Sequence, residues 1–258
     1  RTVTHPLADT TVYVFDVASQ RMKSMTDATG KKTEWVYDGF ARPTQMTAPE
    51  GNYTQYAYDT KGNVTQTTRV AKSGTGLANI VTTANYPCAS TVTCAKPQWT
   101  KDAKGNQTDY TYNSSTGTIS TIVAPADASG IRATTSFSYT TVNGMQMPSG
   151  TSICVNAASC ANTVNEIRTS IGYNANGLPT TVTRQAGDGS LVATTTTAYD
   201  DFGNVLTVDG PLAGSADAVR YRYNAAREVM GVISPDPDGG GALKPRVPRL
   251  TGDAEGRV

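Results

Sequence analysis

Apolar and polar residues alternate in short runs along this chain, and a turn closes each run. In one run Tyr56 and Tyr58 flank Ala57, and the segment Asp59-Thr60-Lys61-Gly62 follows directly. Alternation with a period of two is typical of a half-buried β-strand, because successive side chains point to opposite faces. Long stretches with helical apolar spacing do not occur. The pattern therefore predicts an all-β chain built from short strands.

One phrase returns along the chain: an aromatic residue, any residue, a second aromatic, then Asp or Asn and a turn that contains Gly. Well-kept copies lie at 56–64 and 199–205, and degenerate copies lie at 13–16, 35–38, 110–113, 137–140, 171–174 and 221–224. Asp38 follows Asp16 by 22 residues, which suits two strands and two tight turns. We therefore expect a continuous curved antiparallel sheet of repeated β-hairpins, with about 16 to 20 strands.

Each position of the phrase has a structural role. The Asp or Asn side chain can accept a hydrogen bond from the backbone N–H two residues on, and the Gly can adopt a positive φ. The two aromatics share one face of a strand, so successive repeats build an aromatic ladder. A second Gly turn, as at 27–30, 48–51 and 102–105, completes the unit. We assign these roles to Tyr37, Asp38, Tyr56, Tyr58, Asp59, Gly62, Tyr110, Tyr112, Tyr173, Tyr199, Asp200, Gly203, Tyr221 and Tyr223.

The four cysteines form two pairs with the same spacing, Cys88-x5-Cys94 and Cys154-x5-Cys160. A metal site is one interpretation, but zinc-binding pairs are usually closer together and the single histidine, His5, is distant in sequence. We favour a disulfide that closes each hairpin and contributes about 2 kcal/mol. Paired cysteines also favour an oxidising compartment, and hence export.

The net charge of the chain and its lack of known catalytic motifs argue against several classes of function. The net charge is +1 without a basic run, which argues against nucleic acid and anionic membranes as main partners. No apolar run approaches the roughly 20 residues that span a bilayer. Catalytic signatures are absent, and a nucleophile–histidine pair would need His5. Residues 236–241 begin like a calcium loop, but Val247 stands where Glu is expected, so we favour a plain turn. We predict no catalytic residue, cofactor or metal.

The turns at 37–42, 56–63, 199–204 and 252–257 resemble those of the RHS repeats, also called YD repeats. The resemblance covers nearly the whole chain, although Arg227 stands where Gly is expected. Members of this family build β-sheet spirals that close into hollow shells, and in bacterial toxin systems the shell encloses a C-terminal effector. Related surface proteins are extracellular scaffolds. The aspartyl protease site of some members has no match, so no catalytic residue carries over. The resemblance implies a secreted or cell-surface bacterial protein.

Two functions fit these patterns better than a third, a secreted enzyme such as a polysaccharide lyase, which would need acidic and basic residues clustered at one level of the wall. In the first, residues 1–258 form a single YD-repeat array, part of a longer chain, with decorated insertions at about 70–98 and 141–165. The array would be a non-catalytic wall segment of an exported shell or scaffold that encloses or displays another polypeptide, such as a C-terminal effector. The alternative is an extracellular fibre or adhesin-like module that binds glycans or a neighbouring cell surface. Bare strand edges also predict self-association.

Overall fold

The computed structural model describes residues 2–4, 10–154, 157, 159–238 and 241–248. These residues form strands, turns and irregular segments, without a helix in the described part. His5 and the predicted turn at 252–257 lie outside the described residues. Contacts divide the chain into two compact units, Arg1–Ala126 and Asp127–Val258. Each unit is an antiparallel meander in its own right.

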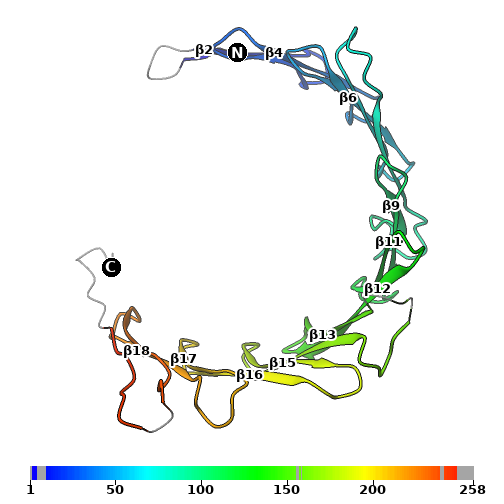
Figure 1. Ribbon diagram of the computed structural model, residues 1–258. Helices are drawn as coiled ribbons and strands as arrows, with labels where there is room; N and C mark the ends of the chain where they lie inside the picture. Colours follow the sequence, from blue (N-terminus) through cyan, green and yellow to red (C-terminus); the bar gives the residue numbers. More distant parts are fainter. Residues whose placement is uncertain (1, 5–9, 155–156, 158, 239–240, 249–258) are drawn as a thin grey trace. The chain divides into compact units, whose positions relative to one another are not determined.

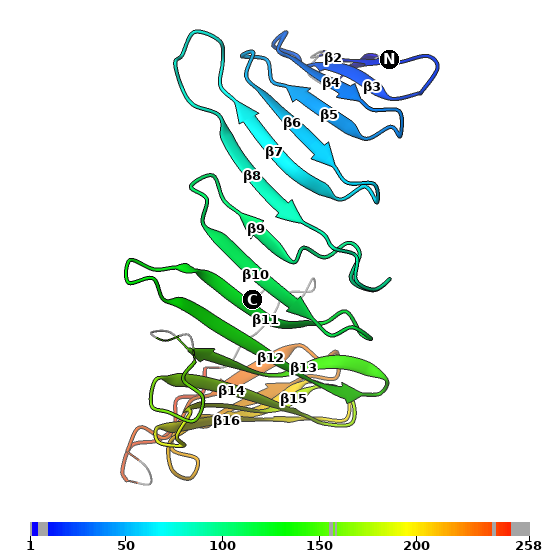
Figure 2. The same ribbon diagram turned by 90° about the vertical axis from the view of Figure 1, so that its right-hand side faces the viewer.

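The first unit runs from β1 to β11, and each strand pairs antiparallel with the next. Figure 2 shows β2 to β11 as a single layer of neighbouring strands. The strands are β1 (Thr2–Thr4), β2 (Thr10–Phe15), β3 (Met22–Thr26), β4 (Lys32–Tyr37), β5 (Pro43–Thr47), β6 (Tyr53–Tyr58), β7 (Val64–Val70), β8 (Ile80–Asn85), β9 (Trp99–Lys101), β10 (Gln107–Tyr112) and β11 (Ile119–Ala126).

The second unit runs from β12 to β19 with the same antiparallel order. In Figure 1 its strands again follow one another as a single layer, coloured from green to orange. They are β12 (Arg132–Val142), β13 (Met145–Cys154), β14 (Glu166–Tyr173), β15 (Pro179–Ala186), β16 (Val192–Tyr199), β17 (Val205–Asp209), β18 (Val219–Tyr223) and β19 (Val229–Ile233).

The predicted fold class is confirmed. The described residues contain 19 strands, within the expected range, and the strands are joined as antiparallel hairpins. Each Asp or Asn phrase closes one end of a hairpin, and the second Gly turn closes the other end. We call the edge formed by the Tyr-Asp and Tyr-Asn turns the YD rim of its unit, and the edge formed by the second turns the opposite rim. That residues 1–258 act as one array stays a prediction.

A β-bulge accompanies the YD rim at eight hairpins. The register shifts each time just before the second aromatic, for example between Val36 and Tyr37 and between Ala57 and Tyr58. Val36 faces Gln45 and Tyr37 faces Pro43, so Thr44 is the extra residue. Its hydroxyl donates to the Val36 carbonyl at 3.3 Å. A bulge bends a strand and increases its twist, so the repeat curves locally at the same point of each hairpin.

The single layer leaves the units with very little core. Within the described residues, the buried apolar side chains are Cys154, Cys160 and Ala218. The chain exposes 16469 Å² of surface, whereas a globular monomer of 27.1 kDa would expose about 11,000 Å². Strand contacts join neighbours in the chain rather than a second layer. Cross-strand side-chain pairs and turn hydrogen bonds must therefore supply much of the stability.

Candidate functional site

The Tyr-Asp turn is the best-defined local structure in the chain. One carboxylate oxygen of Asp59 accepts the backbone N–H groups of Lys61 at 2.8 Å and Asn63 at 2.9 Å. The other oxygen accepts the side-chain amide of Asn63 at 2.8 Å. Gly62 has a φ of 92°, a value that a residue with a Cβ adopts only with strain. The turn after Asp200 repeats these bonds with Phe202 and Asn204.

Other copies reach the same turn without glycine. After Asp38, the residue with positive φ is Ala41 at 64°, and Arg42 replaces the final asparagine by bonding Asp38 through Nε at 2.7 Å. After Asn224 the positive φ belongs to Arg227 at 66°. Arg227 therefore occupies the backbone conformation expected of glycine, so the turn survives this departure from the phrase. The closing hydrogen bonds outweigh the strain of a left-handed residue.

In six hairpins, the second aromatic of the phrase is a tyrosine that bonds to the strand before it. Six tyrosine hydroxyls donate to a backbone carbonyl at or near the start of an earlier strand, at 2.6 to 3.0 Å. The donor–acceptor pairs are Tyr37–Met22, Tyr58–Pro43, Tyr112–Pro97, Tyr173–Pro148, Tyr199–Pro179 and Tyr223–Val205. Sequence reasoning missed this bond. The preference for Tyr over Phe at the second position was the available signal, because only tyrosine carries the hydroxyl.

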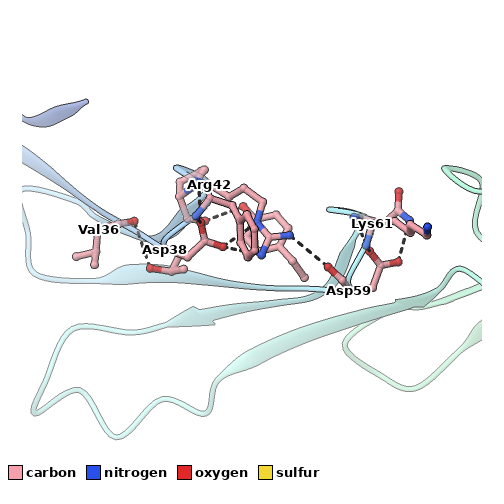
Figure 3. A network of polar contacts seen from close by, with 10 residues as sticks. Val36, Asp38, Arg42, Asp59 and Lys61 are labelled. Carbon is pink, nitrogen blue, oxygen red and sulfur yellow. Dashed lines mark hydrogen bonds and ion pairs between the residues drawn. The ribbon is translucent and has the colours of Figure 1, made fainter. Parts of the chain in front are cut away.

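Neighbouring turns are also tied to each other along the YD rim. Figure 3 shows Arg42 between Asp38 of its own turn and Asp59 of the next. The guanidinium bonds the Asp38 carboxylate and donates from Nη1 to the Asp59 carbonyl at 3.2 Å. It also lies 4.5 Å from the ring centroid of Tyr58 and 5.1 Å from that of Phe40. Arg42 thus combines an ion pair, a hydrogen bond and cation–π contacts in one bridge.

The turn carboxylates are stabilised in their charged form. The Asn63 amide lowers the pKa of Asp59, and the Asn204 amide lowers the pKa of Asp200, in both cases together with backbone N–H donors. The backbone N–H of Ser19, followed by Lys23, lowers the pKa of Asp16 to about 2. Burial raises the pKa of the Tyr58, Tyr112 and Tyr223 hydroxyls. At neutral pH the aspartates are therefore ionised acceptors and the tyrosines are neutral donors.

The first disulfide, between Cys88 and Cys94, lies on the YD rim of the first unit. Its loop follows β8 and takes the place of a Tyr-Asp turn. The side-chain amide of Asn63 reaches across from the preceding turn and donates to the Cys94 carbonyl at 2.9 Å. On the other side Lys96 lies 5.5 Å from the ring centroid of Tyr112. The loop therefore continues the chain of contacts along this rim.

The second disulfide, between Cys154 and Cys160, lies on the opposite rim of the second unit. It adjoins Glu166, which is only 2% exposed. Glu166 accepts from Ser152 Oγ at 2.5 Å and from the Asn162 N–H at 2.6 Å, and it pairs with Arg168 Nε at 3.0 Å. Arg168, then Ser152 and the Asn162 N–H, lower the pKa of Glu166 to about 2. Sequence reasoning found the cysteines but missed this ion pair.

The arrangement offers little for metal or catalytic chemistry. In the described ranges, no three His, Cys, Asp or Glu side chains gather closely enough to hold a metal ion. Of the calcium-like segment, Gly239 and Gly240 lie outside the described residues. Asp238 accepts the Leu243 N–H at 2.9 Å, as a turn residue does. No helix that could cross a membrane occurs in the part of the chain that the structure describes.

The repeat geometry agrees with a comparison against protein families. Residues 15–52 match the family model described as RHS Repeat. This segment is similar to an RHS repeat. The matched segment begins in β2 and ends before β6, so it includes the Asp38 turn and its Arg42 bridge. The same turn bonds recur at Asp59 and Asp200, beyond the matched RHS repeat. No curated protein matches the chain.

Solved structures offer distant likenesses. The crystal structure of TcdB2-TccC3-Cdc42 aligns with 97% of this chain at 13% identity and a TM-score of 0.39, and that of TcdB2-TccC3 gives the same values. The chain spans only 15 to 16% of the length of those chains. A porin-like protein from Bacteroides uniformis aligns with 83% of this chain and 92% of its own, at 12% identity and a TM-score of 0.38.

Proposed function

We propose that this chain is a non-catalytic structural wall segment of an exported RHS-repeat shell or scaffold, which encloses or displays another polypeptide. A structural role of the RHS type is supported by the family match at residues 15–52 and by the recurrence of the same turn at Asp200. We further propose that the protein is exported and that the enclosed polypeptide is a C-terminal effector, as in a toxin-delivery protein.

The observation that carries the proposal is the repeated tie between hairpins. Each tyrosine bond joins one hairpin to the preceding strand, and Arg42 joins one turn to the next. Such ties act between neighbours only, which is how a solenoid-type array gains stability without a central core. An array of this kind can be extended by adding hairpins, and it supplies surface rather than an enclosed reaction site. These properties suit a wall.

The exposed area supports a function within a larger assembly. The chain exposes about half as much surface again as a globular protein of its mass. Apolar side chains stay uncovered on it, including Val36, which is 54% exposed, and Ile80, which is 50% exposed. A single-layer sheet with apolar side chains on its faces is normally stabilised by packing against a further layer. We infer that the rest of a longer chain, or an enclosed polypeptide, covers it.

Export is supported by the two disulfides. Cys88–Cys94 and Cys154–Cys160 account for all four cysteines of the chain. Disulfides persist in oxidising compartments and are rare in the cytosol. A secreted or cell-surface location in a bacterium therefore fits the chemistry of the chain.

Protease protection in the native protein tests the enclosure. The protein would be purified from its source and digested before and after unfolding, and peptides outside the repeats would be followed by mass spectrometry. The proposal expects an additional polypeptide segment that resists digestion until the wall unfolds. Digestion of every segment outside the repeats at the same rate in both states would contradict enclosure.

A further inference from the structure

A pocket that the wall role does not use opens within the second unit. Its volume is about 290 Å³, and β12, β13, β14 and β15 contribute its lining. Two neighbouring cross-strand rows form it. One row is Ser136, Ser152, Arg168 and Gln185, and the other is Ser138, Gly150 and Ser170. Paired residues in adjacent strands project to the same face, so these side chains surround one hollow.

Gly150 forms the floor of the pocket. A Cβ at this position would lie 2.5 Å from the Thr169 carbonyl oxygen and 3.1 Å from Ser138 Oγ, so a side chain does not fit there. Gly150 stands between Ser138 and Ser170 in its cross-strand row and lines the pocket without a side chain. The volume is close to the lower bound of about 300 Å³ for small-molecule sites.

Arg168 is held in a fixed orientation at the edge of this pocket. Its Nε pairs with the buried Glu166 at 3.0 Å, and its Nη2 donates to Asn162 Oδ1 at 2.6 Å. Its contacts with the described residues do not involve Nη1, and its side chain is 35% exposed. The protein therefore holds one edge of the guanidinium, and as far as the described residues go, Nη1 and the second N–H of Nη2 can donate to a ligand.

The functional groups that line the pocket indicate which kind of ligand it can bind. Its lining contains hydroxyls, the Gln185 amide and the guanidinium, and the described residues that line it bring no carboxylate. A guanidinium end binds a carboxylate through paired N–H groups, and hydroxyls and amides exchange hydrogen bonds with other hydroxyls. We propose that this pocket binds a carboxylated sugar residue of an acidic glycan, with the carboxylate on Arg168 and the ring hydroxyls on the serines and Gln185.

If the pocket binds a glycan, the second cysteine hairpin has a role in positioning Arg168. The Cys154–Cys160 bond closes the loop that precedes Asn162. Asn162 in turn contacts both Glu166 and Arg168. The disulfide thus restrains the residue that orients the guanidinium. The binding site does not depend on the proposed wall function, because all of its residues lie within one unit.

Titration of the full chain with trigalacturonate, observed by calorimetry, tests the site. The methyl ester of the same trisaccharide is the uncharged control. Binding of the acid with at least about tenfold weaker binding of the ester is expected, since a charge-assisted pair is lost. Absence of binding at millimolar acid, or equal affinity for acid and ester, would overturn the proposal.

Protein variants locate the binding. Arg168→Gln should weaken binding of the acid at least about tenfold, whereas Arg184→Gln, on the other face of β15, should leave it unchanged. Ser170 is exposed, so Ser170→Tyr fills the pocket without touching the ion pair and should abolish binding in a folded chain. Replacing Cys154 and Cys160 by serine should weaken binding, and the same change at Cys88 and Cys94 should not. Unchanged affinity in folded Ser170→Tyr would place the glycan elsewhere and refute the site.

Discussion

The two cysteine hairpins have the same spacing but different positions and partners. The Cys88–Cys94 loop lies on the YD rim of its unit, where Asn63 of the preceding turn donates to the Cys94 carbonyl. The Cys154–Cys160 loop lies on the opposite rim of its unit, beside the buried Glu166 and its ion-pair partner Arg168. The first loop is held by neutral amide and hydroxyl bonds, and the second by hydrogen bonds of Asn162 to the two members of an ion pair.

Equal cysteine spacing therefore determines the size of a disulfide loop but not its structural role. The first loop stands in for a Tyr-Asp turn and preserves the bonding along its rim. The second interrupts the plain repeat and positions a charged side chain beside a pocket. The two cysteine pairs are therefore alike in spacing but not in the rim on which their loops lie.

The largest loss of stability is expected from a substitution that disturbs the packing around Glu166, next to the second loop. In Gly187→Ala the new Cβ would lie 2.3 Å from Glu166 Oε2 and 2.8 Å from the Thr163 carbonyl oxygen. Overpacking of this kind costs about 3 kcal/mol. Thermal unfolding should show the loss, together with faster amide exchange in the second loop. Gly39→Ala, which meets no atom within 4 Å, is the control and should be nearly neutral. Equal effects of the two changes would contradict the packing at Glu166.

Removing each disulfide compares the loops directly. Each bond closes a loop with a sequence separation of 6, for which chain entropy gives about 2 kcal/mol. Serine at Cys154 and Cys160 should cost more than serine at Cys88 and Cys94, because Cys154 and Cys160 are also buried and Asn162 is released. Denaturant unfolding of the two double variants measures the difference. A larger cost for the first pair would reverse our account of the two loops.

The hydrogen bond of the Tyr112 hydroxyl should stabilise the first loop and not the second. Tyr112→Phe removes the hydroxyl that donates to the Pro97 carbonyl at 3.0 Å, at the end of this loop. The loss should be about 1 kcal/mol, as for a typical hydrogen bond. Hydrogen exchange should rise at residues 88–98 and stay constant at 159–166. Tyr56→Phe is the control, because no hydrogen bond of the Tyr56 hydroxyl is among the described contacts. Similar exchange in both variants would mean that the tie is dispensable.

Lowering the pH should weaken the hydrogen bonds of Asp59 before those of Glu166, and at neutral pH neither set should change. Both Asp59 and Glu166 have a lowered pKa in the folded chain, so each stabilises it above the unfolded value near 4 and loses this contribution as pH falls. Asp59 is held by amide donors, whereas Glu166 also faces a guanidinium and has a pKa of about 2.

Amide exchange measured between pH 5 and pH 2 checks this order. The Asn63 N–H, bonded to Asp59, should lose protection before the Asn162 N–H, bonded to Glu166. Asp59→Asn keeps an acceptor oxygen that does not titrate, and it should remove the pH dependence at Asn63 while leaving Asn162 unchanged. Earlier loss at Asn162 would contradict the charge-assisted bond.

The sequence predicts the periodic part of this structure well. Alternation and turn residues are local signals, so the strands, the antiparallel hairpins and the positive φ at Gly62 follow from them. The hydrogen bond from Tyr58 to Pro43, by contrast, joins residues 15 apart in neighbouring strands. That bond depends on register, which single-residue preferences do not contain. The Glu166–Arg168 pair was missed because charged residues on a strand usually face solvent.

Electron cryomicroscopy of the native protein that contains these residues tests the central claim most directly. The account predicts a hollow particle whose wall is one sheet thick, with strands about 4.8 Å apart and additional polypeptide density inside or displayed on it. A solid globular particle, in which these hairpins pack around an ordinary hydrophobic core, would contradict the proposed wall.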